Sequence, residues 1–210
     1  MLKEIIWTKN LGYVIGLIAS DGNLSKTRKR IQIKSADLEL VENFKKALKL
    51  KEKIGITKSR KGKDHYYIMF SNKDFYDFLI SIGIHPKKSH TIKALNIPER
   101  FFCDFLRGFF DGDGTFYTFW DKRWPNSFCF QISFASASKE FIYWLKEENS
   151  RLFSVKGFVC IGKNVYNLRY VKGDTRKIFK TMYYNNCSFF LSRKRLKMQE
   201  AFKKDEIMPR

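Results

Sequence analysis

The pattern of apolar and polar positions contains two similar runs, each ending in Asp-Gly. The first covers residues 14–22 (VIGLIASDG), and the second covers residues 106–114 (LRGFFDGDG), 92 positions later. In both runs, small residues recur four positions apart and therefore share one helix face. Small side chains on that face let two helices approach closely. The pattern predicts two buried helices that pack against each other.

Alternation after the first run predicts a strand. Ile31 and Ile33 point to one side of the segment 30–34, and the residues between them are polar or basic, which is the period of a half-buried strand. A helical pattern then opens at residues 35–37 and continues to Leu48. The other elements of this half are predicted as strands at residues 54–57 and 66–70, joined by a basic turn, and a short helix at residues 73–82.

The second half of the chain repeats this order. It predicts a strand at residues 129–134, a helix from 136 to 152, strands at 155–161 and 166–171, and a short helix at 174–183. We interpret the chain as a diverged duplication with halves at residues 1–95 and 96–210, linked near Pro98. Each half is α+β with the order αββαββα. Each sheet is expected to pack one apolar face on helices and to leave its other face polar and basic.

The charge balance favours a nucleic acid as partner. The 210 residues include 41 Lys and Arg against 21 Asp and Glu, a net charge of +20, and the pI is about 9.8. A basic domain of this kind carries the electrostatic footprint of nucleic-acid binding. Hydrophobic residues make up 44%, which is enough for a core and argues against disorder.

Several classes are disfavoured. No apolar segment is long enough to span a bilayer, and the N-terminus shows no leader pattern, so an intracellular location is expected: bacterial or archaeal cytoplasm, or an organelle. The four cysteines are widely spaced, which favours free thiols over a zinc site. The three histidines lack the accompanying residues of a histidine-metal nuclease.

The two motifs and the duplicated order together resemble the LAGLIDADG homing endonucleases of the single-chain, two-motif type. The resemblance covers nearly the whole chain. The first motif departs from the family pattern at Val14-Ile15 and Ala19-Ser20, and the second at Arg107 and Gly112. The aspartate that carries catalysis in this family is present in both motifs, as Asp21 and Asp113. The resemblance implies a saddle of two antiparallel four-stranded sheets with the motif helices at its centre.

The resemblance also implies a long asymmetric DNA target, with one phosphodiester hydrolysed on each strand and short 3′ overhangs. Two carboxylates at adjacent helix ends repel each other and the helix dipoles, and a divalent cation relieves both penalties. We expect Mg²⁺, with Ca²⁺ or Mn²⁺ able to substitute. The residues expected at the metal site are Asp21, Asp113, Ser20 and Gly112, and those at the helix interface are Gly12, Gly16, Gly108 and Gly112.

Further site residues follow from the resemblance and from the basic strands. The family places Lys and Gln near the catalytic waters, and the candidates here are Gln32, Lys34, Lys88, Gln131 and Lys194. Arg, Lys and Gln also read base edges in the major groove or contact phosphates. The candidate DNA-binding residues are Arg28, Arg30, Gln32, Lys34, Arg60, Lys63, Gln131, Ser133, Lys163 and Arg169.

The halves are not expected to be equivalent. Ala135 aligns with Lys34, so the two cleavage centres are expected to differ. Asp111 aligns with Ala19 and is therefore expected to form a salt bridge or cap near the helix interface, outside the metal pair. The two motif helices of one chain can pack against each other without a second copy, which predicts a monomer.

Two other functions stay open at this stage. A protein with this scaffold can act as an RNA maturase or as a DNA-binding regulator that does not cut. Relatives with such roles commonly lose one or both acids, and both are present here. A generic basic protein associated with RNA or the ribosome is the third possibility, in which both aspartates would be dispensable.

Overall fold

The computed structural model describes residues 5–123 and 127–207. The first half contains α1 (Lys9–Asp21), β1 (Gly22–Leu24), β2 (Arg30–Ser35), α2 (Leu38–Ala47), β3 (Gly55–Lys58), β4 (Asp64–Ser71) and α3 (Lys73–Ser81). The second contains α4 (Phe102–Asp113), β5 (Gly114–Trp120), β6 (Phe128–Ser136), α5 (Lys139–Phe153), β7 (Phe158–Gly162), β8 (Val165–Val171) and α6 (Lys172–Met182), followed by α7 (Ser192–Ile207).

Each half forms one antiparallel four-stranded sheet. The strand orders are β1-β2-β4-β3 and β5-β6-β8-β7, the same order in both halves. The registers also correspond: Gly22 lies opposite Ile33 in the first sheet, and Gly114 lies opposite Phe134 in the second. The predicted α+β duplication is confirmed, and Lys34 and Ala135 occupy equivalent positions.

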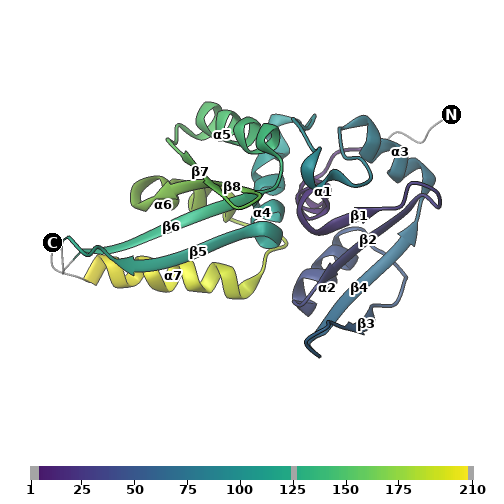
Figure 1. The fold of residues 1–210 in the computed structure, drawn as a ribbon, viewed down its shortest axis with the longest axis horizontal. Coiled ribbons are helices and arrows are strands. Elements are labelled where there is room, and N and C mark those ends of the chain that lie inside the picture. The colour runs from purple at the N-terminus through teal and green to yellow at the C-terminus, as the bar shows by residue number, and fades with distance from the viewer. Residues whose placement is uncertain (1–4, 124–126, 208–210) are drawn as a thin grey trace.

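Helices α1 and α4 pack against each other at the centre, and the two sheets extend from them in opposite directions (Figure 1). Glycines permit this close approach. A Cβ atom on Gly16 would lie 2.2 Å from the carbonyl oxygen of Phe105, and one on Gly108 would lie 2.0 Å from that of Tyr13. These are backbone atoms, so no side-chain rotation could make room.

The sheets bury one face each. Ile31, Ile33 and Ile68 of the first sheet are fully buried and lie on the side covered by α2. Phe130 and Phe134 do the same in the second sheet. The alternation read from the sequence therefore assigns the buried face correctly in both halves.

Three elements of the structure carry no clear signal in the sequence. β1 has only three residues, too few for an alternating pattern, and β5 directly follows the second motif without a turn signal. Helix α7 is mostly polar, and only Met198, Ala201 and Phe202 are buried on it. The ring of Phe202 packs on Phe130 at 5.0 Å between centroids, so α7 covers the second sheet.

Some boundaries also differ from those predicted. The strand expected from residue 155 begins at Phe158, although Val155 is buried in the preceding loop. The four cysteines are partly buried free thiols. The outermost residues of the two expected halves, 1–4 and 208–210, lie outside the described part of the chain, and the exact boundary between the halves stays a prediction. No helix among the described residues has the length and apolar character needed to cross a membrane.

Candidate active site and nucleic-acid interface

Asp21 and Asp113 are the last residues of α1 and α4, and the packing of these helices brings the two carboxylates to one place. A Cβ atom on Gly112 would lie 3.0 Å from the Oδ2 atom of Asp21. Asp113 is exposed and Asp21 is partly buried. Desolvation, followed by the charge of Asp113, raises the pKa of Asp21 to about 6. Desolvation also raises the pKa of Asp113.

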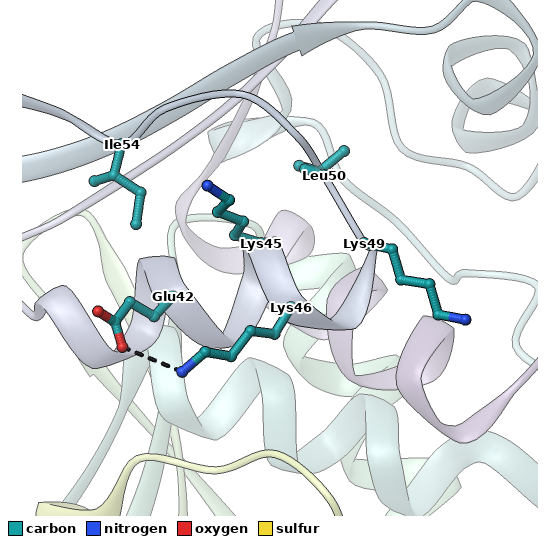
Figure 2. A pocket seen from close by; sticks show the side chains of 6 residues that line it. All are labelled: Glu42, Lys45, Lys46, Lys49, Leu50 and Ile54. Carbon is teal, nitrogen blue, oxygen red and sulfur yellow. Dashed lines mark hydrogen bonds and ion pairs between the residues drawn. The ribbon is translucent and has the colours of Figure 1, made fainter.

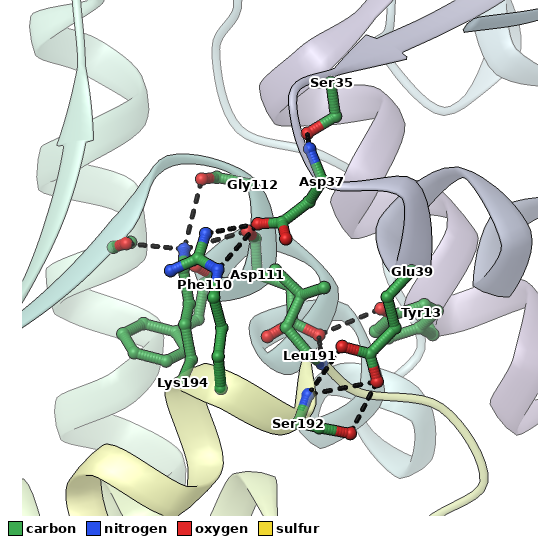
Figure 3. A network of polar contacts seen from close by, with 12 residues as sticks. Tyr13, Ser35, Asp37, Glu39, Phe110, Asp111, Gly112, Leu191, Ser192 and Lys194 are labelled. Atoms are coloured by element: carbon green, nitrogen blue, oxygen red, sulfur yellow. Dashed lines mark hydrogen bonds and ion pairs between the residues drawn. The ribbon is translucent and has the colours of Figure 1, made fainter. Parts of the chain in front are cut away.

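Two lysines lie against the same helix ends. The Nζ atom of Lys88 donates a hydrogen bond to the Ser20 carbonyl at 2.9 Å. That of Lys194 donates to the carbonyls of Phe110 at 2.6 Å and Gly112 at 3.2 Å, among others. An ammonium group at a helix C-terminus offsets the partial negative charge of the free carbonyls. Lys194 and its neighbours are drawn in Figure 3.

The electrostatics of the lysines reflects both burial and the carboxylates. Desolvation lowers the pKa of Lys88 to about 8, while the charges of Asp113 and Asp21 oppose the change. Desolvation lowers the pKa of Lys194 to about 8 as well, opposed first by Asp111. The helix ends thus form a compact cluster of two carboxylates and two ammonium groups.

The carboxylate pair fits a hard divalent cation. Two oxygen-bearing side chains with raised pKa values gain from a nearby positive charge, and carboxylate oxygens suit Mg²⁺, Ca²⁺ and Mn²⁺. Across residues 5–123 and 127–207 there is no group of three or more His, Cys, Asp or Glu side chains able to enclose a metal. A cation at this position would therefore depend on water or phosphate oxygens for its remaining ligands.

Ser20 and Gly112 lie beside the pair, but their polar atoms are already engaged. The Ser20 hydroxyl donates to the carbonyls of Gly16 at 3.2 Å and Leu17 at 3.0 Å within α1. The carbonyls of Ser20 and Gly112 accept hydrogen bonds from the two lysines. Each carbonyl keeps a second lone pair, so the backbone is the part of these residues able to assist a cation.

The surroundings of the two aspartates differ. A hollow of about 230 Å³ adjoins Asp113 and is lined by Ser20, Lys88 and the small residues Ala135 and Ala137, among others. On the other side, Lys34 replaces Ala135 in the same register. Asp37, which directly precedes α2 there and is labelled in Figure 3, forms an ion pair with Arg193.

Asp111 lies in a buried polar network behind the site. The Tyr13 hydroxyl donates to its Oδ2 atom at 2.9 Å, and the Leu191 amide donates to the same atom at 2.8 Å (Figure 3). Its Oδ1 atom has no partner among the described residues. Burial raises the pKa of Asp111 to about 7. Its carboxylate joins α1, α4 and the segment before α7.

We expect Asp111→Asn to retain measurable DNA cleavage and to change the free energy of unfolding by no more than about 1 kcal/mol. The amide oxygen of Asn can accept both existing hydrogen bonds, and the cost of burying a charge disappears. Urea unfolding and a cleavage assay on the purified variant measure the two effects. A loss of cleavage as complete as that of Asp113→Asn would contradict the assignment of Asp111 to structure.

A second buried polar group lies on α4, and the sequence does not reveal its role because two of its partners are about 80 residues away. Arg107, a departure from the family motif, is 1% exposed. It donates to the Asp104 carboxylate at 2.7 Å and to the carbonyls of Met182 and Phe189 at 2.8 and 2.7 Å. Its hydrogen bonds therefore connect α4 to the last residue of α6 and to the segment that follows α6. Only the unusual charge within an apolar run signals it in the sequence.

The open face of the first sheet carries the expected polar residues. Arg30, Gln32 and Lys34 alternate with the buried isoleucines of β2 and so point away from the core. Arg30 and Gln32, with Arg28 from the preceding turn, line a hollow of about 410 Å³. Arg60 and Lys63 lie at the turn between β3 and β4, at the far end of the sheet, and are exposed.

The open face of the second sheet differs from the expected basic surface. Gln131 accepts a hydrogen bond from the Tyr117 hydroxyl at 2.7 Å, and Ser133 is only 6% exposed. Arg169 lies opposite Ser133 on the same face, and Lys163 is exposed in the turn between β7 and β8. The remaining exposed side chains on this face include large apolar residues. The basic pattern of the first half is not repeated in the second.

Gln131 does not approach the carboxylates. It pairs with Tyr117, four residues beyond Asp113 along β5, which is roughly 13 Å at the rise of a strand. Gln32 is nearer, because it pairs with Asn23, two residues after Asp21. Strand register therefore puts Gln32 and Lys34 at the Asp21 end of the first sheet, and puts Gln131 farther out on the open face of the second sheet.

A further hollow lies outside this interface. Figure 2 shows it at the end of α2, where Lys45, Lys46 and Lys49 surround about 400 Å³. Lys46 also pairs with Glu42 at 3.3 Å. Helix α2 covers the apolar face of the first sheet, so this hollow is on the opposite side from Arg30 and Gln32. It takes no part in the candidate site.

Comparison with protein families gives two matches within the chain. The family described as LAGLIDADG-like domain matches residues 8–83 and residues 103–182, one match in each half. A comparison with curated proteins finds no match. The two family matches correspond to the two sheets with their helices.

The fold also resembles solved structures. The LAGLIDADG meganuclease I-AabMI bound to uncleaved DNA is 16% identical, with a TM-score of 0.65 over 96% of this chain and 91% of that one. The homing endonuclease I-DmoI in complex with DNA and Ca is 16% identical, with a TM-score of 0.59 over 94% and 97%. Full-length DUF199/WhiA from Thermatoga maritima is 12% identical, with a TM-score of 0.62 over 100% of this chain. This chain spans 65% of that protein.

Proposed function

This chain belongs to the family of LAGLIDADG-like domains, and we propose that it is a site-specific endonuclease that cleaves double-stranded DNA with a divalent cation. The observation that carries the proposal is the juxtaposition of Asp21 and Asp113 at the ends of two packed helices. The positive charge of the chain and the two open sheet faces support binding to DNA. The similar structures of I-AabMI and I-DmoI hold DNA, and those of I-DmoI also contain Ca or Mn.

In this proposal the two sheets lie along the duplex on either side of α1 and α4. Residues on the open faces contact bases, and the exposed cations at the hairpin turns contact phosphates. The halves differ in sequence, so the target is long and asymmetric. The two motif helices pack against each other within one chain, so no second copy is needed to complete the site. The chain is therefore proposed to act as a monomer.

Asp21 and Asp113 are the residues proposed to hold the cation, with Mg²⁺ as the natural one. When bound, such a cation lowers the pKa of a water molecule and neutralises charge on the leaving oxygen. Lys88 and Lys194 hold the helix ends in place and supply positive charge beside the phosphate. Lys34 and Gln32 are proposed to orient water on one side of the pair.

The test is cleavage of a duplex DNA library of randomised sequence in the presence of Mg²⁺, with sequencing of the cut ends. The proposal expects breaks at one long asymmetric sequence, dependent on the cation. Calcium and manganese are tested in parallel, because both occur in the similar structures. Binding of the library without any cut would overturn the catalytic part of the proposal.

The two strands are expected to be cut at unequal rates. Lys34 and Ala135 hold equivalent positions in the two sheets, and Ala135 lines the hollow beside Asp113. Loss of a positioned polar group commonly costs a hundredfold in rate or more, so we expect a difference of about tenfold or greater. Strand-specific end labels on a single target duplex measure it. Lys34→Ala should bring the two rates together, and equal rates in the wild type would contradict this prediction.

A second candidate function is DNA or RNA binding without cleavage, as in a regulator or a maturase. The observation in its favour is that Lys88 and Lys194 already offset charge at the helix ends, so the fold does not depend on a cation. Tight, site-specific binding of a duplex in Mg²⁺ without product would favour the regulator. Splicing of a host intron in vitro would favour the maturase.

A further inference from the structure

The two open sheet faces differ at equivalent positions. The strand registers match the halves residue for residue, so each position on one face has a counterpart on the other. On the central strands, the counterparts of Arg30, Gln32 and Lys34 are Gln131, Ser133 and Ala135. The first face thus presents two cations and an amide where the second presents an amide, a hydroxyl and a methyl group.

The second face also exposes large apolar side chains. Val171 is 46% exposed and occupies the position of Ser71 in the first half. Phe119 is 36% exposed at the outer end of β5, and its ring lies 6.1 Å from that of Tyr117. Phe158 is 43% exposed beside Arg169. Strand alternation directs all of these side chains away from the buried core.

Exposed apolar side chains on a binding face gain most from contact with apolar groups of the bound molecule, because both are then removed from water. The net charge of +20 opposes contact with a second copy of this chain and favours a polyanion. In duplex DNA, the apolar group within the major groove is the C5 methyl of thymine, and it is read by contact with apolar side chains.

We propose that the second half of this protein recognises a thymine-rich half-site through contacts of Val171 and Phe119 with thymine methyl groups. The first half reads its own half-site by hydrogen bonding from Arg30, Gln32 and Lys34. This inference rests on the proposed function, because it assumes that both sheets face the DNA. It assigns different chemistry of recognition to the two halves.

The position of Arg169 predicts where a guanine lies relative to the thymines along this half-site. Its side chain is partly exposed, and Arg169 lies two residues closer to the helix ends than Val171 on the same face of β8. Arginine forms paired hydrogen bonds with guanine. The half-site therefore contains a guanine nearer the cleavage position and thymines farther out.

The test replaces thymine by deoxyuridine, which removes only the methyl group. The target is first obtained by the library selection described above, and duplexes are then made with deoxyuridine in one half-site or the other. Binding is measured by fluorescence anisotropy without added cation. Each contacted methyl removed should weaken binding about fourfold, the effect of losing one buried carbon group. The same replacement in the other half-site should have little effect.

Protein variants connect the effect to the named residues. Val171→Ser installs the residue of the first half, and Phe119→Thr removes the exposed ring. Both positions are exposed, so circular dichroism should show an intact fold. The double variant should bind the thymine and deoxyuridine duplexes equally well. Ser71→Val, the matched change in the first half, should leave the original deoxyuridine penalty unchanged.

The outcomes separate this inference from the proposed function. Specific cleavage that is insensitive to deoxyuridine in both half-sites would overturn the inference and leave the endonuclease intact. Failure to select any site would overturn the proposed function and the inference with it. A change of sedimentation coefficient in the double variant, without a change in deoxyuridine sensitivity, would show that the apolar face joins protein copies and would also overturn the inference.

Discussion

Replacing either motif aspartate by asparagine is expected to abolish DNA cleavage while preserving DNA binding. Asp113→Asn and Asp21→Asn each remove one of the two carboxylates proposed to hold the cation. Loss of an outer-shell partner of a metal ligand commonly costs ten- to hundredfold in activity, so loss of a ligand itself should cost at least about a hundredfold. Cleavage of the selected target in Mg²⁺ gives the rate, and anisotropy gives the affinity.

The same variants have a distinctive effect on stability. The fold disfavours the ionised form of Asp21, because burial and the charge of Asp113 raise its pKa to about 6. A neutral amide removes this penalty, so at pH 7 without cation neither variant should be less stable than the wild type. Stability equal to or greater than that of the wild type would mark the two acids as residues kept for function.

Asp74→Asn is the matched control. Asp74 lies in the first turn of α3, away from the helix ends, and the substitution changes the net charge by the same amount. It should leave the cleavage rate within about twofold of the wild type. Full cleavage by Asp21→Asn or Asp113→Asn, at a rate similar to that of this control, would contradict the proposed metal site.

Substitution of the glycines between α1 and α4 is expected to have the largest effect on folding. In Gly108→Ala the new Cβ atom would lie 2.0 Å from the Tyr13 carbonyl oxygen, and in Gly16→Ala it would lie 2.2 Å from that of Phe105. Both obstacles are backbone, so the helices must separate. We expect each variant to lose at least about 3 kcal/mol in free energy of unfolding, the upper part of the range for overpacking.

Gly173→Ala provides the comparison. Gly173 lies in the first turn of α6, and no atom lies within 4 Å of a Cβ atom placed there. The substitution should be neutral or stabilising by up to about 1 kcal/mol, since alanine favours helix. Urea unfolding followed by circular dichroism measures all three variants. A loss for Gly108→Ala within about 0.5 kcal/mol of the control would show that the helices tolerate a wider spacing.

Much of the architecture could be predicted because it is encoded locally. The motif helices, the alternation at Ile31 and Ile33 and the matching order of the second half are patterns within short segments. Two copies of the pattern were enough to place Asp21 and Asp113 at helix ends. The short strand β1 and the polar helix α7 carry too weak a pattern, and only packing on the sheets defines them.

The surroundings of the candidate site could be predicted only in part. The family resemblance predicts Lys88 and Lys194 as site residues, but their hydrogen bonds to the ends of α1 and α4 join residues 68 and 82 positions apart. The separation of Gln131 from Asp113 follows from strand register, which the sequence does not state. The same holds for the network of Asp111, whose partners come from α1 and from the segment before α7.

Side-chain periodicity and chain order are sufficient to predict the duplicated α+β fold, the buried face of each sheet and the two acids. The polar groups that meet at the helix ends, and the difference between the two open faces, become visible only in the folded chain. Those features depend on the register of paired strands and on the close contact of α1 with α4. Such contacts join residues far apart in the chain, and no local pattern specifies them.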